Sequence, residues 1–161
     1  MILSSEYSTG LALLLSSCVA AIAYALAALQ GEQSIKRVRW ALFVGWIAQA
    51  FALVLDIGGF GSASPGARFG FAPALSMTVW LTLGVYLVES RFLPLPGARR
   101  VLAMLALIAV LLAFIFPGEA RAHADSPWAP LHWFLGLASY GLFGVAVLHA
   151  ALMNAAERKM R

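Results

Sequence analysis

The stretch 128–161, WAPLHWFLGLASYGLFGVAVLHAALMNAAERKMR, indicates the fold class of this chain. From Leu131 to Asn154 it holds 24 residues without Lys, Arg, Asp or Glu, and a basic cluster follows. A helix of that length measures about 36 Å, because each residue adds about 1.5 Å, while the hydrocarbon core of a bilayer is about 30 Å thick. The stretch therefore predicts a membrane-spanning helix.

The composition of the whole chain favours the same conclusion. Of the 161 residues, 62% are hydrophobic and 11% are charged, whereas soluble domains contain about 25% charged residues. The net charge of +4 does not indicate a nucleic-acid partner, because the basic residues lie in short clusters between apolar runs. The single cysteine, Cys18, lies in the first apolar run, so a disulfide within the chain and a Cys-based metal site are excluded.

Four further apolar runs precede this helix, and Gly- and Pro-containing segments separate several of them. We therefore predict an all-α fold, a polytopic bundle of five transmembrane helices that forms a single domain over residues 1–161. The predicted spans are 10–29, 40–60, 71–88, 99–116 and 131–154.

The first run has two interpretations. Ala23, Tyr24 and Ala25 resemble the small-x-small cleavage site of a secretory signal peptide. However, no Lys or Arg precedes Lys36, so the basic start of a signal peptide is missing, and the apolar run is too long. We expect a retained helix.

The basic residues predict an orientation. Two of the 11 Lys and Arg residues, Arg68 and Arg121, fall on one side of the predicted membrane. Because basic loops stay in the cytoplasm, we expect the N-terminus outside and the C-terminus inside. The residues on the predicted inner side are Lys36, Arg37, Arg39, Arg91, Arg99, Arg100, Arg158, Lys159 and Arg161.

The usual catalytic motifs are absent from the sequence. It contains no Gly-x-Ser-x-Gly, no phosphate-binding loop with Lys and no His-Glu-x-x-His. Asp56 and Glu89 are predicted near opposite membrane faces, where each ends its helix rather than forming a carboxylate pair. We expect a protein that is not an enzyme.

The three histidines are the remaining candidates for chemistry. His132 opens the last span, His149 lies near its inner end, and His123 lies in the outer loop. His132 and His149 are 17 residues apart, which is about 25 Å along a helix, so they cannot share one metal. An interfacial polar role and a cofactor-binding role both remain open for His132, while a packing contact or a backbone carbonyl is expected to orient His149.

Small residues predict the packing of the last span. They permit close approach of another helix, as membrane bundles prefer, and so we expect this span to be a central packing helix. The residues are Gly136, Ala138, Ser139, Gly141 and Gly144.

Three segments carry a resemblance to a known family. They are ARFGFAPALSMTVWL at 67–81, LIAVLLAFIFPG at 107–118 and LHWFLGLASYGLFGVAVLHAALMNAAER at 131–158. The chain resembles the cytochrome c assembly (CcsA-like) family of haem-handling membrane proteins over about residues 35–161, and most closely its short, bacterial YpjD-like branch. The resemblance implies that His132 matches an externally facing axial ligand of haem iron.

Two departures from the family pattern accompany the resemblance. Relatives often carry a His in the second span, where this chain has Gln49, and an amide is a poor iron ligand beside imidazole. Relatives also continue for several more helices, with a second outer His. We therefore expect the 161 residues to be an N-terminal portion or a short relative.

The resemblance leads to two expectations about function. The first is an inner-membrane, cytochrome c assembly-type protein that binds or handles haem at its outer face through His132, with Arg121 or Arg68 near the propionates. Its partners are the lipid bilayer and other cytochrome c biogenesis proteins, with no nucleic acid. The second is a structural or accessory membrane subunit without a cofactor that supports a transporter or an assembly partner.

Overall fold

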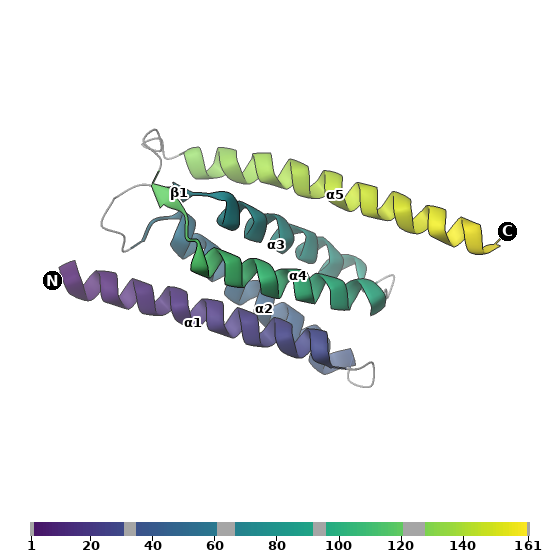
Figure 1. The fold of residues 1–161 in the computed structure, drawn as a ribbon, viewed down its shortest axis with the longest axis horizontal. Coiled ribbons are helices and arrows are strands. Elements are labelled where there is room, and N and C mark those ends of the chain that lie inside the picture. The colour runs from purple at the N-terminus through teal and green to yellow at the C-terminus, as the bar shows by residue number, and fades with distance from the viewer. Residues whose placement is uncertain (1, 31–34, 61–66, 92–95, 121–127, 161) are drawn as a thin grey trace.

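The computed structural model describes residues 2–30, 35–60, 67–91, 96–120 and 128–160. Within these ranges the chain forms five helices and two very short strands (Figure 1). The helices are α1 (Ile2–Leu29), α2 (Ile35–Ile57), α3 (Phe71–Glu89), α4 (Pro96–Ile115) and α5 (Ala129–Met160), and the strands are β1 (Arg68–Phe69) and β2 (Glu119–Ala120). The predicted all-α class with five helices is confirmed.

The helix ends differ from the predicted ends by up to eight residues. α2 begins at Ile35 instead of residue 40, and α5 continues to Met160 instead of residue 154. The sequence boundaries marked the ends of charge-free runs, but Lys, Arg and Glu are good helix formers. The helices therefore continue beyond the apolar segments and include the charged residues that flank them.

α2 ends where two glycines permit a sharp turn. The N–H of Phe60 donates to the carbonyl of Leu55 at 3.3 Å, and the N–H of Gly59 donates to the carbonyl of Asp56 at 3.1 Å. Gly59 has a φ of 64°, a left-handed conformation that glycine adopts without steric cost. This Schellman-type arrangement closes the helix and places Asp56 in its last turn.

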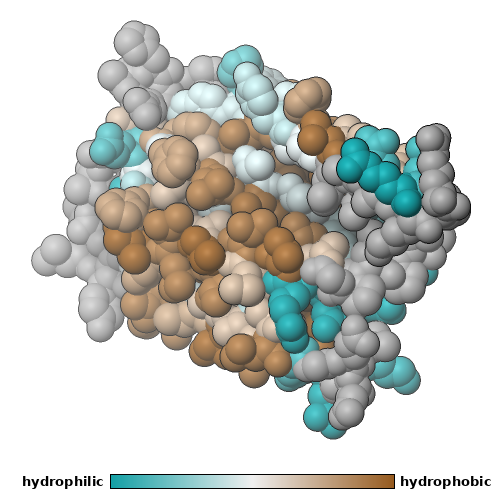
Figure 2. All heavy atoms as spheres, turned by 45° about the vertical axis from the view of Figure 1, so that its right-hand side comes forward, coloured by the Kyte–Doolittle hydropathy of each residue, from teal (hydrophilic) through white to brown (hydrophobic). Residues whose placement is uncertain are grey.

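Four of the helices are long and apolar enough to cross a membrane, namely α1, α2, α3 and α4. In α5 the apolar segment of the described residues is Leu131–Val147, so the fifth span stays a prediction while its helix is confirmed. Large hydrophobic side chains cover much of the outer surface, as a bilayer requires (Figure 2). The molecule is thus built as a multi-pass membrane protein.

The first four helices form a closed bundle. α1 packs on α2 and α4, and α3 packs on α2 and α4, so each helix has two neighbours in the ring. α5 lies outside this ring and packs mainly on α3 (Figure 1). The prediction that the last span is a central packing helix is therefore wrong, because small residues allow a close approach but do not by themselves produce one.

Successive helices alternate in direction, and the N- and C-termini lie at opposite ends of the bundle (Figure 1). At one end β1 pairs antiparallel with β2, with Arg68 opposite Ala120 and Phe69 opposite Glu119. We call this the ribbon end. We call the other end, which holds Lys36, Arg39, Arg91, Arg99 and Arg100, the basic end.

Close packing of α1 on α2 centres on Tyr24, which is fully buried. Gly45 lies against its ring, and a Cβ at that position would sit 2.7 Å from Cε1 of Tyr24. Small residues on α1 let the two backbones approach in the same region, as is common in membrane bundles. These residues are Ala20, Ala27 and Ala28.

Two tryptophans join α2 to α3. The rings of Trp46 and Trp80 stack with centroids 4.8 Å apart and planes 5° apart. The indole N–H of Trp46 donates to the carbonyl of Trp80 at 3.0 Å, and the indole N–H of Trp80 donates to the carbonyl of Trp46 at 2.9 Å. Both polar indole groups are thus satisfied inside the bundle.

Candidate functional site

His132 lies in the first turn of α5 at the ribbon end, and its side chain is exposed. Its backbone N–H donates to the carbonyl of Trp128 at 3.0 Å. Within the described ranges its imidazole makes no hydrogen bond or ion pair. The next residue, Trp133, packs on Phe69 of β1 with ring centroids 4.8 Å apart. The helix turn that carries His132 is therefore anchored while its ring stays open to the surroundings.

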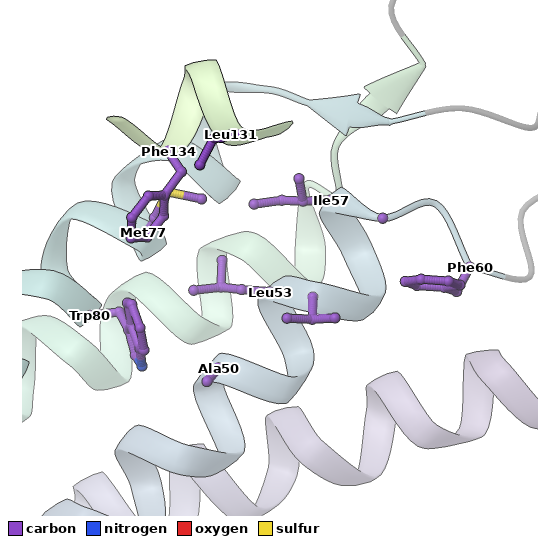
Figure 3. Close-up of a pocket in the computed structure, with 10 residues that line it drawn as sticks. Ala50, Leu53, Ile57, Phe60, Met77, Trp80, Leu131 and Phe134 are labelled. Carbon is purple, nitrogen blue, oxygen red and sulfur yellow. The ribbon is translucent and has the colours of Figure 1, made fainter. Parts of the chain in front are cut away.

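An apolar groove of about 370 Å³ lies beside this turn, between α2, α3 and α5 (Figure 3). Leu131 and Phe134 of α5 enter it, and His132 is not among its lining residues. At about 100° per residue, His132 is rotated away from the face that Leu131 and Phe134 share. The groove and the imidazole thus occupy different sides of one helix. The other lining residues include Leu53, Ile57, Met77 and Trp80.

Gln49, in the second predicted span, is fully buried and holds three helices together. The Tyr24 hydroxyl donates to Oε1 of Gln49 at 2.6 Å. Nε2 of Gln49 donates to the hydroxyl of Ser76 at 2.9 Å and to its carbonyl at 3.1 Å. Both the oxygen and the nitrogen of the amide are therefore engaged in hydrogen bonds between helices, and the Gln49 side chain is not arranged as an iron ligand.

Asp56 is buried at the ribbon end and fastens α2 to the segment after α4. Both carboxylate oxygens accept from the N–H of Gly118, at 3.1 Å each. Nε of Arg68 donates to the carbonyl of Gly118 at 2.6 Å, and the positive charge of Arg68 attracts the Asp56 carboxylate. Asp56 lies in the last turn of its helix, as expected, but its bond to Gly118 was not visible in the sequence.

His149 lies at the level of the basic end and contacts α3. Its Nδ1 lies 3.0 Å from the carbonyl of Val145, which confirms that a backbone carbonyl orients this ring. Its Nε2 lies 3.2 Å from Oε2 of Glu89, and when His149 is protonated this contact is an ion pair. The sequence placed His149 and Glu89 on the same side of the membrane but did not indicate that α5 packs on α3.

The other residues named for the site are divided between described and undescribed segments. His123 and Arg121 lie outside the described residues. Arg68 is described, and its Nε is engaged with Gly118. Over the described ranges no group of three or more His, Cys, Asp or Glu side chains is arranged to hold a metal ion. Of the two histidines that the structure describes, His132 is the one with an exposed ring at the ribbon end.

Comparisons with known family models, with curated proteins and with solved structures gave no match.

Proposed function

We propose that this protein is an inner-membrane, cytochrome c assembly-type protein that binds or handles haem at its outer face. In this proposal the N-terminus and the ribbon end lie outside, and His132 is one axial ligand of the haem iron. Haem supplies an iron centre that commonly takes imidazole as an axial ligand. The protein acts as a carrier and catalyses no bond-making step.

The exposed imidazole of His132 carries this proposal. An axial haem ligand needs an accessible ring nitrogen on a backbone that is held in place. The Trp133–Phe69 contact supplies the fixed backbone, and the exposed ring supplies the nitrogen. The resemblance of 131–158 to the family segment that opens with an axial His supports the same residue.

Positive charge on the ribbon-end side of the sequence is available to bind the propionates of haem. The guanidinium of Arg has five N–H donors, and the bond from Arg68 to Gly118 uses one of them. Arg121 carries the second positive charge on this side of the sequence. In this proposal Arg121 or Arg68 contacts the propionates, with His132 as the metal ligand.

One observation favours the alternative, an accessory subunit without a cofactor. α5 packs mainly on α3, and it leaves large side chains exposed on its other sides, among them Tyr140 and Phe143, at 76% and 71%. A partner helix would cover this surface. The alternative predicts a stable protein that takes up no haem and elutes together with a partner.

Haem titration of the purified protein in mild detergent distinguishes the two functions. The wild-type protein should develop a Soret band, and His132→Ala should abolish it or weaken it strongly because the imidazole ligand is lost. His149→Ala is the matched histidine control and should keep the band, because that residue lies about 25 Å away along α5. His123→Ala should alter the spectrum slightly.

Elution profiles of all three variants must match the wild type, so that a lost band reports a lost ligand and not a misfolded protein. A wild-type protein that shows no Soret band contradicts the haem proposal and supports the accessory role. If His132→Ala still binds haem stoichiometrically, the assignment of His132 as the ligand is wrong, but the proposal of haem binding stands.

A further inference from the structure

A cleft lies between the start of α2 and the end of α3 at the basic end. Its volume is about 670 Å³. Three cationic side chains, Lys36, Arg39 and Arg91, share it with three apolar ones. We call it the basic cleft and define it by Lys36, Arg39, Trp40, Phe43, Leu87 and Arg91.

The described residues do not neutralise the cations of the basic cleft. Over the described ranges, Lys36, Arg39 and Arg91 form no ion pair and no side-chain hydrogen bond. α2 begins and α3 ends at this level, so their helix dipoles oppose each other and the positive charge comes from the side chains. An unpaired cluster of this kind attracts an anion.

Glu89, the acidic residue nearest in sequence to Arg91, is turned away from the basic cleft. Leu87 and Arg91 are four residues apart and lie on one face of the chain at the end of α3, whereas Glu89 is about 200° from Leu87. Glu89 instead contacts His149 on α5, with 3.2 Å between Oε2 and Nε2. The docking of α5 thus holds this negative charge away from the three cations.

The apolar wall of the basic cleft leads into the membrane. Trp40 and Phe43 form an edge-to-face pair with centroids 6.0 Å apart, and Phe43 stacks on Trp46 at 6.4 Å. Residues 40, 43 and 46 are spaced three apart, so they form one ridge along α2. The ridge reaches Trp80 of α3 through the stacked pair of tryptophans.

Distances along α2 match the layers of a bilayer. Arg39 and Phe43 are four residues apart, which is about 6 Å of helix. The interfacial layer of one leaflet measures roughly 5–8 Å, the difference between the total thickness and the hydrocarbon core shared over two sides. When the Arg39 guanidinium lies at the level of the phosphates, Phe43 lies at the start of the hydrocarbon.

We propose that the basic cleft binds an anionic phospholipid, with the phosphate against Lys36, Arg39 and Arg91 and an acyl chain along Trp40, Phe43 and Leu87. Guanidinium groups pair with phosphate through two parallel hydrogen bonds, and basic pockets between membrane helices bind such head groups. A soluble anion would use the cations alone and leave the aromatic wall exposed. This proposal does not depend on the binding of haem.

Native mass spectrometry of the purified protein with phosphatidylglycerol and with phosphatidylcholine tests the proposal. The wild-type protein should bind phosphatidylglycerol more tightly than phosphatidylcholine. Arg39→Gln/Arg91→Gln should weaken this binding at least about tenfold, which corresponds to about 1.4 kcal/mol. Arg37→Gln/Arg158→Gln removes the same charge at the same end from two exposed positions outside the basic cleft, and it should change the affinity less than about twofold.

Three results would overturn the proposal. Equal weakening in both double variants would mean a diffuse attraction to the basic end. Equal binding of the two lipids by the wild-type protein would mean that the phosphate site does not exist. Competition by millimolar inorganic phosphate as effective as that by the lipid would identify a site for a free anion.

Discussion

Tyr24, Gln49 and Ser76 show how polar side chains are tolerated inside this bundle. Each is at most 1% exposed, and the amide of Gln49 bonds to both of the other residues. A buried polar group without a partner is costly, whereas a satisfied network costs little and orders the helices around it. Gln49 therefore specifies how α1, α2 and α3 pack together.

A double-mutant cycle of Tyr24→Phe and Gln49→Leu measures this contact. Each single variant leaves a polar partner unsatisfied, so the double variant should be more stable than the sum of the single losses predicts. We expect a coupling energy of about 0.6–1.7 kcal/mol, between the average and the largest value measured for hydrogen bonds between membrane helices. Unfolding titrations in mixed detergent micelles provide the measurement.

Ser139→Ala is the control for this cycle. The Ser139 hydroxyl is exposed and donates only to the carbonyl of Gly136 in its own helix, at 2.7 Å. It should leave the free energy of unfolding nearly unchanged. Strictly additive effects of Tyr24→Phe and Gln49→Leu would show that their hydrogen bond adds no stability.

At the scale of elements, α5 is less closely packed than the ring of four helices, because it contacts mainly α3. α5 reaches α3 through Gly141, where an added Cβ would lie 3.8 Å from Cβ of Leu81 and 3.9 Å from the carbonyl of Thr78. At Gly136 and Gly144, such a Cβ would have no atom of another described element within 4 Å. Of these three glycines, only Gly141 permits helix contact.

Gly141→Leu and Gly144→Leu form a matched pair that tests this arrangement. The larger side chain at Gly141 meets α3, so we expect a loss of about 1–3 kcal/mol and a broader elution profile in detergent. Gly144→Leu should elute and unfold like the wild-type protein, since its side chain enters open space. A larger effect at Gly144 would mean that α5 packs through its other face.

At the scale of the whole molecule, the basic end and the ribbon end differ in charge. Nine of the 11 Lys and Arg residues fall on the side of the basic end. Positively charged loops remain in the cytoplasm during insertion. Because successive helices alternate in direction (Figure 1), we predict that the N-terminus lies outside and that the ribbon end with His132 faces out as well.

Cysteine labelling in a Cys18→Ala background tests this orientation. Glu119→Cys lies in β2 at the ribbon end, and Glu157→Cys lies near the end of α5, both at exposed positions. In intact cells an impermeant maleimide should label the Glu119→Cys variant and reach the Glu157→Cys variant only after the cells are permeabilised. The reverse pattern would place the ribbon end inside and remove the basis for an outer haem site.

The sequence alone determined the number of helices, their approximate ends and the charge difference between the two ends. These properties are local, because a run of apolar residues forms a helix in a bilayer whatever its neighbours are, and charged residues end such a run. The same reasoning located His132 at the start of the last helix and Gln49 within the second.

Only the tertiary structure decided which faces of these helices meet. A membrane helix such as α3 is apolar on all sides, so its pattern does not specify which side packs and which side meets lipid. The packing moved α5 from the expected centre to the outside, joined Asp56 to Gly118 across 62 positions, and turned Glu89 away from Arg39 and Arg91. The basic cleft exists because two helices that are separate in sequence bring their cations to one place.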